Sequence, residues 1–416
     1  MSLELRPFQP EETAAFGRVL SIVFGNYGQR RPEEPQPDTV RPEWSLCAFE
    51  DGEMATTYAA YPMVQRLNGG KSPAAGVTAV GTLPHFRRRG HLRAIMETDL
   101  RRRYEQRMEP LAILHASIAG IYQRYGYAVT TTSVRFTIDP RWIRFTPSLA
   151  PATGMWREGS RDEAPLLDRM YREFSSKRNG YLHRAPVMWD MQTFGTAPNP
   201  GDPQNAGPSI ISIYEEDGQP AGFVAWTARW MPSFHGDHFG PGQRIFVRDF
   251  VWLTPGAHRA MWEFFSRFDL AAAIHVDAAP TDDPAFYTLL DPRELNATHR
   301  DAILARIIDL ERLLPLRPYG SDGRIVFEVR DEMCPWNAGR WALDASTDAG
   351  RSAVSRTTAA PELTMDVATL AQLLYGQISP SQAVRYGRAE AAAGAPLRTW
   401  DAIWRTEYAP FCPNGF

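Results

Sequence analysis

The sequence predicts a mixed α/β (α+β) protein built from more than one domain. Its 416 residues are more than a single hydrophobic core usually serves. Short β-branched runs bounded by turn residues alternate along the chain with segments of helical periodicity. The order of these elements in the first 150 residues recurs over residues 151–294, and the pattern changes from about Leu295. We therefore expect three domains, at 1–150, 151–294 and 295–416.

Composition and charge exclude several classes of protein. The chain is 44% hydrophobic and 22% charged, as in ordinary globular proteins. A net charge of -3 gives no overall basic field for nucleic acid, and no apolar run approaches the roughly 20 residues of a membrane span. The N-terminus has no secretory pattern, and Cys47, Cys334 and Cys412 suit free thiols in a reducing compartment. These features predict a cytoplasmic protein without a nucleic-acid partner or membrane span.

The first domain begins with a strand and a helix. Residues 3–8 have strand character, and Pro10 opens a helix that runs to about Phe24 with acidic residues in its first turn. Residues 25–42 are polar and rich in proline, which is typical of a loop. Two strands are then expected at 45–49 and 54–67, around the turn Asp51-Gly52.

The most informative stretch follows, from Val77 to Tyr127. Val77–Thr82 suits a buried strand, and an arginine-rich turn closing on Gly90 precedes a helix with an apolar face. A strand, a glycine turn and a helix N-terminus together direct backbone N–H groups outward, which favours an anion such as a pyrophosphate. The alternative is an ordinary turn with three solvated arginines. A second strand is expected at 111–115, a short helix at 118–126 and a strand from Tyr127, with 136–145 closing the domain.

The remaining elements show the same periodicities. In the second domain we expect helices at 161–177 and from Pro255 to Leu270, with strands at 209–214, 222–226, 244–253 and 271–276. In the third we expect a helix at 300–314, strands at 323–330, 339–344 and 362–366, and helices at 367–374 and 381–393, the last capped by Ser381.

Two motifs in the informative stretch resemble a known family. The run R-R-R-G-H-L-R (residues 87–93) resembles the coenzyme A loop of the Gcn5-related N-acetyltransferases (GNAT), Gln/Arg-x-x-Gly-x-Gly/Ala, and departs from it at Leu92. His115–Tyr127 resembles more closely the H-A-S-x-x-G-I-Y-x-R-[FY]-G-Y segment of the enhanced intracellular survival (Eis) acetyltransferases. This resemblance implies tandem GNAT folds, the second without cofactor, followed by a sterol-carrier-like α+β domain. It also implies a hexamer.

The resemblance also implies a position for acetyl-CoA as co-substrate. The pantetheine arm would lie along the backbone of Val80, Gly81 and Thr82. The pyrophosphate would be held by the turn from Arg88 to Arg93. The residues expected to contact the cofactor are Val80, Gly81, Thr82, Arg88, Arg89, Gly90, His91, Leu92, Arg93, Ser117 and Ile118.

Acetyl transfer to an amine needs a general acid for the departing thiolate and a base for the ammonium. By resemblance, Tyr122 is the acid; a phenol with a pKa near 10 is protonated at neutral pH. The base would be the terminal carboxylate of Phe416, which is ionised at pH 7. The family often has an acidic or aromatic residue before this position, whereas this chain has Gly415. Tyr125 and Tyr127 are expected to pack in the core.

Several alternatives stay open at this stage. His115 is expected to pack or hydrogen-bond beside the thioester, a catalytic role being the alternative, and His235-Gly236-Asp237-His238 lacks the further spaced ligands of a metal site. The acceptor is expected to be a primary amine of an aminoglycoside, polyamine or lysine side chain, which the acidic loop residues Glu33, Glu34 and Asp38 could attract. A noncatalytic protein that binds coenzyme A or a lipophilic ligand is the second candidate.

Overall fold

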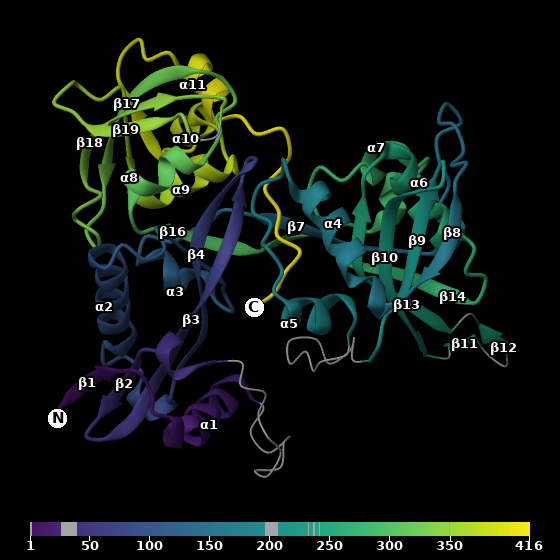
Figure 1. Cartoon of the computed structure of the whole chain (residues 1–416), viewed down its shortest axis with the longest axis horizontal. Coiled ribbons are helices and arrows are strands. Elements are labelled where there is room, and N and C mark those ends of the chain that lie inside the picture. The colour runs from purple at the N-terminus through teal and green to yellow at the C-terminus, as the bar shows by residue number, and fades with distance from the viewer. Residues whose placement is uncertain are drawn as a thin grey trace. The chain divides into compact units, whose positions relative to one another are not determined.

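A computed structural model describes residues 2–25, 40–195, 207–231, 233–235, 238–240, 242–348 and 350–416. It divides into two compact units, one of residues 1–130, 303–406 and 416, the other of residues 131–302 and 407–415 (Figure 1). The acidic residues Glu33, Glu34 and Asp38 lie outside the described residues, and so do the side chains of His235 and His238. These two units do not coincide with the three domains expected from the sequence, because the first unit combines N-terminal and C-terminal parts of the chain. The three domains therefore remain a prediction.

The first unit contains a seven-stranded sheet in the order β1-β2-β3-β4-β5-β16-β6. Its strands are β1 (Leu3–Arg6), β2 (Cys47–Glu50), β3 (Glu53–Leu67), β4 (Gly70–Thr82), β5 (Leu111–His115), β16 (Ile303–Ile307) and β6 (Ala128–Val129). Helix α2 (His91–Glu105) packs Ile95 and Met96 into one cluster of the core, and α1 (Thr13–Phe24) packs Phe16 and Val19 into another. A short helix, α3 (Ala119–Gln123), follows β5.

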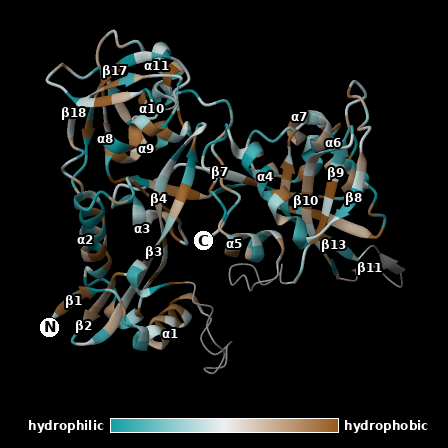
Figure 2. Ribbon diagram, in the orientation of Figure 1, coloured by the Kyte–Doolittle hydropathy of each residue, from teal (hydrophilic) through white to brown (hydrophobic). Residues whose placement is uncertain are grey.

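The second unit contains a comparable sheet in the order β15-β7-β14-β13-β10-β9-β8. Its strands are β15 (Thr298–Asp301), β7 (Thr132–Ile138), β14 (Ala271–Ala279), β13 (Gln243–Trp252), β10 (Gln219–Trp230), β9 (Ile210–Glu216) and β8 (Met155–Gly159), with a separate pair β11 (Ser233–His235) and β12 (His238–Gly240). Its helices are α4 (Ala164–Ser175), α5 (Pro186–Met188), α6 (Pro255–Ser266) and α7 (Ala285–Thr288). Figure 2 shows hydrophobic residues along the inner strands of both sheets.

A smaller sheet in the first unit has the order β19-β18-β17-β20-β21. Its elements are β17 (Gly323–Arg330), β18 (Gly339–Ala345), β19 (Ala353–Arg356), β20 (Leu363–Asp366), β21 (Ala389–Ala391), α8 (Leu310–Leu313), α9 (Val367–Tyr375), α10 (Pro380–Arg385) and α11 (Leu397–Trp404). It packs on the first sheet, where Tyr104 stacks on Trp336 at 4.5 Å and Asn68 donates to the carbonyl of Pro318 at 2.9 Å. Arg317 is fully buried here and donates to the carbonyl of Trp404 at 2.6 Å.

One predicted strand lies in a different sheet from the one we expected. Residues 136–145 were expected to close the first domain, but β7 pairs with β14 and β15 in the second sheet. Its inward residues Val134, Phe136 and Ile138 are fully buried in the core of the second unit. Conversely, β16 lies in the first sheet, where it pairs with β5 on one side and β6 on the other. The chain thus changes sheets at residues 130–131 and again at 302.

Two further predictions in the third domain were wrong. Residues 300–314 form two strands and the four-residue helix α8, because Ile303–Ile307 is buried along its whole length between two neighbouring strands. A short apolar run does not distinguish such a strand from a buried helix. The cap of α10 is Ser379, whose hydroxyl accepts from the N–H of Gln382, and not Ser381; Pro380 occupies the first helical turn. The helix ends at Arg385, and part of its predicted range forms β21.

Candidate active site

Strands β4 and β5 diverge at the point where the cofactor was expected. Their parallel pairing covers only Ala75–Val77 with Ala112–Leu114, although β4 continues to Thr82. A bulge marks the divergence, with Ala79 at a φ of 54° and a register shift against β3. Over residues 78–82, therefore, β3 pairs on one side of β4 and, among the described strands, none pairs on the other. Val80, Gly81 and Thr82 lie on this stretch, whose backbone can hydrogen-bond the amides of an extended ligand.

The turn after β4 has the geometry of an anion site. Arg88 has a φ of 65° and Gly90 a φ of 85°, and such left-handed residues turn successive N–H groups toward one side. Gly90 is the N-cap of the 15-residue helix α2 and supplies no side-chain cap, so the first N–H groups of the helix are left for another acceptor. A Cβ built on Gly90 meets no atom within 4 Å, so the space beside it is open. The backbone from Arg88 to Arg93 therefore forms one continuous cradle.

The side chains of this turn have different environments. Arg89 forms an ion pair with Glu50, and His91 is buried with its Nε2 2.9 Å from the same carboxylate. Arg93 is paired with Glu97 at 2.8 Å on the surface. Arg88 is exposed and forms no ion pair with a described residue, so it is the arginine best placed to meet a phosphate. His91 contributes its backbone to the turn, while Leu92 packs against the core.

Sequence reasoning missed Glu50. This carboxylate, at the end of β2, is 7% exposed and contacts both Arg89 and His91. These two contacts connect the turn to β2. It precedes the turn Asp51-Gly52, and in the sequence it resembles any polar residue at a strand end. Only the pairing of β2 beside β3 places it under a turn some 40 residues later.

The other wall of the divergence is the end of β5 and helix α3. Ser117 and Ile118 follow β5, and Ile118 is 63% exposed. Tyr122 lies on α3, half-buried, with its ring 5.9 Å from that of Tyr127 in an edge-on contact. Burial raises the pKa of Tyr122 to about 12, so its hydroxyl is protonated throughout the neutral range. Tyr125 and Tyr127 are buried, as predicted.

The last residue of the chain belongs to the same unit. The ring of Phe416 lies 5.3 Å from that of His115, at the end of β5. It also covers Gly76 of β4: a Cβ built there would lie 3.2 Å from Cδ2 of Phe416 and 2.5 Å from the sulfur of Met63. Gly76 is paired with Ile113 just before the strands diverge. Phe416 and Tyr122 thus both lie near the end of β5. Phe416 contacts His115, the last residue of this strand, and Tyr122 lies on helix α3, which follows it.

The second unit has a similar frame, but its helix N-terminus is occupied. Helix α6 follows β13 as α2 follows β4, and Thr254 caps it by accepting from the N–H of Ala257 at 2.9 Å. Glu216 accepts from the hydroxyl of Thr254 at 2.8 Å, and a Cβ on Gly256 would lie 2.2 Å from its carboxylate. This negative charge sits at the first turn of α6, where an incoming pyrophosphate would be repelled. The first unit alone has the open anion cradle among the described residues.

Diverging strands followed by an uncapped helix N-terminus are compatible with a GNAT fold, and comparisons with known proteins show that the chain is a GNAT acetyltransferase. Models of the acetyltransferase (GNAT) domain match residues 4–130 and 180–307, and a model of the sterol carrier protein domain matches 310–413. An uncharacterised N-acetyltransferase of Streptomyces griseus is 31% identical over the full length of both chains. The N-acetyltransferase Eis of Mycobacterium tuberculosis is 29% identical, over 80% of this chain and 79% of that protein.

Solved structures resemble the whole chain. The crystal structure of Eis1 from Mycobacterium abscessus superposes over all of both chains with a TM-score of 0.79 and 26% identity. A GCN5-related N-acetyltransferase of Anabaena variabilis, at 21% identity and a TM-score of 0.82, shares the fold. The chain belongs to the Eis-like family of GNAT N-acetyltransferases. It is therefore an acetyltransferase with two GNAT folds and a sterol-carrier-like domain, and its GNAT domains imply acetyl-CoA as the co-substrate.

Proposed function

We propose that this enzyme transfers the acetyl group of acetyl-CoA directly to a primary amine of an aminoglycoside, a polyamine or a lysine side chain. The observation that carries the proposal is the pair of groups beside the end of β5: the phenol of Tyr122 and the terminal residue Phe416. In this proposal Tyr122 is the general acid and the α-carboxylate of Phe416 is the general base. Val80, Gly81, Thr82, Ser117 and Ile118 line the acyl-pantetheine arm, and residues 88–93 hold the pyrophosphate.

The reaction follows from the chemistry of these two groups. The carboxylate takes a proton from the ammonium, directly or through water, and the free amine attacks the thioester carbonyl. The C–N bond forms, the attacking nitrogen loses its second proton to solvent, the C–S bond breaks, and the hydroxyl of Tyr122 donates its proton to the departing sulfur. Because burial raises the pKa of this phenol to about 12, its hydroxyl is protonated in the neutral range and available as a donor. The phenolate regains its proton from solvent after the product leaves.

The first experiment measures thiol release from acetyl-CoA with a panel of amines, using the enzyme and a variant with one glycine appended after Phe416. The extension converts the α-carboxylate into a neutral amide and moves the charge about 3.5 Å along the chain. The Phe416 ring can keep its contacts with His115 and Gly76. We expect most activity to be lost with little change in melting temperature or coenzyme affinity. Full activity in the extended enzyme would show that the base lies elsewhere.

Location and assembly complete the proposal. No helix among the described residues is long and apolar enough to cross a membrane. We propose a cytoplasmic enzyme that assembles as a homohexamer, as the family resemblance implies. The mass of the assembly in solution tests the second statement.

A further inference from the structure

A chain of polar side chains connects the end of β2 with the end of β4 inside the first unit. A carboxylate oxygen of Glu50 lies 2.9 Å from Nε2 of His91, the first residue of α2. Nδ1 of the same ring lies 3.3 Å from the hydroxyl of Thr56 on β3, which in turn lies 3.0 Å from the hydroxyl of Thr82, the last residue of β4. Glu50, Thr56 and His91 are 7%, 0% and 4% exposed, so these contacts are shielded from water.

Each group in this chain finds its partner in the next. A carboxylate accepts hydrogen bonds, an imidazole has a nitrogen on each side, and a hydroxyl can donate one bond while it accepts another. A buried polar group that loses its partner destabilises the fold by more than the bond itself contributes. The ring of His91 is therefore restricted to one orientation, between Glu50 and Thr56.

Glu50 holds the turn on both sides of Gly90. Besides contacting His91, it forms an ion pair with Arg89. The backbone of this turn is strained, since Arg88 has a φ of 65°, a conformation that a non-glycine residue keeps only where its surroundings hold it. Two contacts with one buried carboxylate supply such a restraint.

Thr82 is connected to the same turn twice. Its hydroxyl reaches His91 through Thr56, and its carbonyl accepts from Nε of Arg87 at 3.2 Å. Thr82 ends the stretch of β4 that, among the described strands, has a pairing partner on one side only. The separation between this stretch and the N–H groups of the turn is therefore fixed before a ligand binds.

We propose that Glu50, Thr56 and His91 are positioning residues for the coenzyme. In the proposed function the pantetheine arm lies along residues 80–82 and the pyrophosphate on residues 88–93, so one ligand must meet both parts at once. Parts held at a fixed separation bind such a ligand more tightly, because the protein loses less conformational freedom on binding. This proposal rests on that placement of the coenzyme. It adds no group to the proton transfers, so affinity and turnover should respond separately.

Thr56→Val tests the proposal, because it removes the hydroxyl that connects the two parts and leaves the contacts of Glu50 in place. The probes are coenzyme A, which spans both parts, and ADP, which has the pyrophosphate without the arm. We expect the affinity for coenzyme A in calorimetry to fall about 10-fold, as for the loss of one buried hydrogen bond, and the affinity for ADP to stay the same. KM for acetyl-CoA should rise with kcat retained.

Two variants control for packing. Thr56→Ser keeps the hydroxyl and should keep the parent affinity for coenzyme A. Thr130→Val removes an equally buried threonine hydroxyl of the first unit, which donates to the carbonyl of Ile303 at 3.2 Å, and should also keep it. A loss in either control as large as that in Thr56→Val would show an effect of packing and overturn the proposal. So would an equal loss of affinity for coenzyme A and ADP in Thr56→Val.

Glu50→Gln tests the other end of the chain. It removes the charge that holds Arg89 and His91, so the affinities for coenzyme A and ADP should both fall, about 10- to 100-fold, as for the loss of a hydrogen bond to a charged group. Asp331→Asn is the control, since this carboxylate is also 7% exposed and pairs with Arg306 at 2.7 Å. Tighter binding in Glu50→Gln would mean that the carboxylate acts on the coenzyme by repulsion, and the positioning role would be wrong.

The glycine variant of the turn separates this proposal from the one on which it rests. If Gly90→Val weakens coenzyme A binding but Thr56→Val and Glu50→Gln bind it as the parent does, the placement of the coenzyme stands and the positioning role is wrong. If none of the three variants weakens binding, the placement fails and the positioning role fails with it.

Discussion

Tyr122 is the residue whose chemistry is most sharply defined by its surroundings. Its ring packs edge-on against Tyr127, and burial, with a smaller contribution from the nearby Tyr125 hydroxyl, raises its pKa to about 12. A phenol with this pKa is a weaker acid than a free one, and it is protonated throughout the neutral range. It can therefore act as a donor to sulfur without a pH threshold of its own.

Tyr122→Phe should lower kcat by roughly 10²–10⁴ while the fold and coenzyme affinity are retained, because only the donated proton is removed. The rate of thiol release at saturating amine gives kcat. The control is Tyr127→Phe, whose hydroxyl is buried and has no hydrogen-bond partner among the described residues. An unaltered turnover number for Tyr122→Phe would remove this residue from the mechanism.

The same substitution changes how stability depends on pH. The pKa of Tyr122 is raised from its ordinary value of 10.0 to about 12 on folding, so its contribution to stability is complete below pH 10 and is lost as the pH rises toward 12. Melting temperatures measured from pH 9 to 12 should therefore fall less steeply in Tyr122→Phe than in the parent enzyme. Parallel curves would indicate that the hydroxyl is not shielded from water.

At the scale of elements, two glycines shape the site for different reasons. Gly90 needs its positive φ of 85° to start α2 with its N–H groups outward, whereas Gly76 needs its lack of a side chain to let Phe416 lie on β4. Each therefore permits a substitution that changes one part of the site and leaves the other in place.

Gly90→Val should weaken coenzyme A binding, because it strains the turn and places a side chain in the open space beside the N–H groups. Calorimetry with coenzyme A measures the affinity. Gly218→Val is the matched control: Gly218 has a φ of 72°, a Cβ there also meets nothing within 4 Å, and it lies in the β9–β10 turn of the second unit. Equal affinities in the two variants would place the pyrophosphate elsewhere.

Gly76→Ala should lower kcat, because the added methyl group contacts Phe416 and Met63 and moves the terminal ring. Overpacking of this kind costs about 1–3 kcal/mol of stability wherever it occurs. Gly323→Ala is the control, since its Cβ would lie 2.6 Å from Cδ1 of Ile403 in the sterol-carrier-like domain. We expect both variants to lose similar stability and only Gly76→Ala to lose activity in the thiol-release assay. If both retain full kcat, the position of the ring is immaterial to catalysis.

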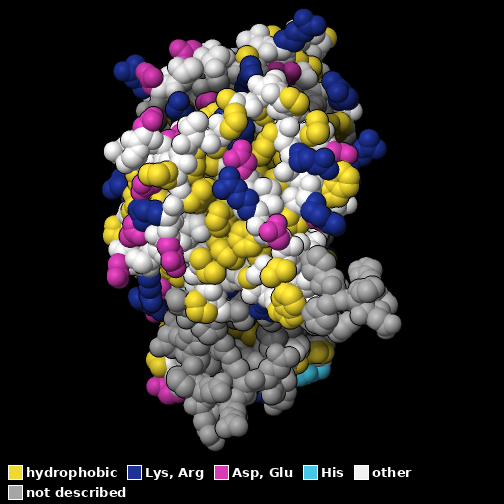
Figure 3. Space-filling model, turned by 90° about the vertical axis from the view of Figure 1, so that its right-hand side faces the viewer, with side chains coloured by type: hydrophobic (Ala, Val, Ile, Leu, Met, Phe, Trp, Pro, Cys, Tyr) yellow, Lys and Arg dark blue, Asp and Glu magenta, His cyan; other side chains and the backbone are white. Residues whose placement is uncertain are grey.

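At the scale of the whole molecule, the surface carries apolar residues that the chain itself does not cover. Figure 3 shows one face on which hydrophobic side chains gather among charged ones. In the second unit Met155, Trp230, Met231 and Leu270 are 72%, 54%, 55% and 63% exposed. Burial of exposed apolar side chains such as these favours association between chains. The proposed hexamer would bury such residues.

Light scattering at micromolar concentration should therefore give about six times the mass of the 46.8 kDa chain. Trp230→Glu, which replaces an exposed apolar side chain with a charge, should lower the mass if the residue lies in an interface. The matched exposed substitution Tyr386→Glu, in the first unit, serves as its control. A monomeric mass for the parent enzyme would overturn the hexamer.

The local pattern of residues determined the cofactor side of this protein. Val77–Tyr127 predicted a buried strand, a glycine turn, a helix, a second strand and a short helix, and the structure has all five in that order. This was possible because each signal is short-range: β-branched runs, a turn closed by Gly90 and an apolar helical face act within a few residues of one another. The same holds for Gly323–Arg330, where the predicted strand coincides with β17.

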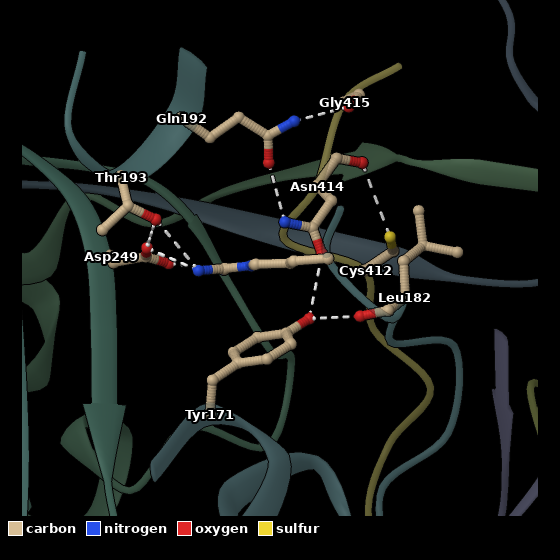
Figure 4. A network of polar contacts seen from close by, with 9 residues as sticks. Tyr171, Leu182, Gln192, Thr193, Asp249, Cys412, Asn414 and Gly415 are labelled. Atoms are coloured by element: carbon tan, nitrogen blue, oxygen red, sulfur yellow. Dashed lines mark hydrogen bonds and ion pairs between the residues drawn. The ribbon is translucent and has the colours of Figure 1, made fainter. Parts of the chain in front are cut away.

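Tertiary structure decided everything that depends on pairing between distant segments. The pairing of β7 in the second sheet and of β16 in the first, the contacts of Glu50 with Arg89 and His91, and the hydrogen bond between Tyr171 and Asn414 (Figure 4) all join residues far apart in the chain. An apolar strand suits either sheet, a glutamate at a strand end suits any surface, and an asparagine near a terminus suits solvent. Their partners are selected by packing and by the need to satisfy buried polar groups, and those are properties of the folded chain that no short stretch of sequence contains.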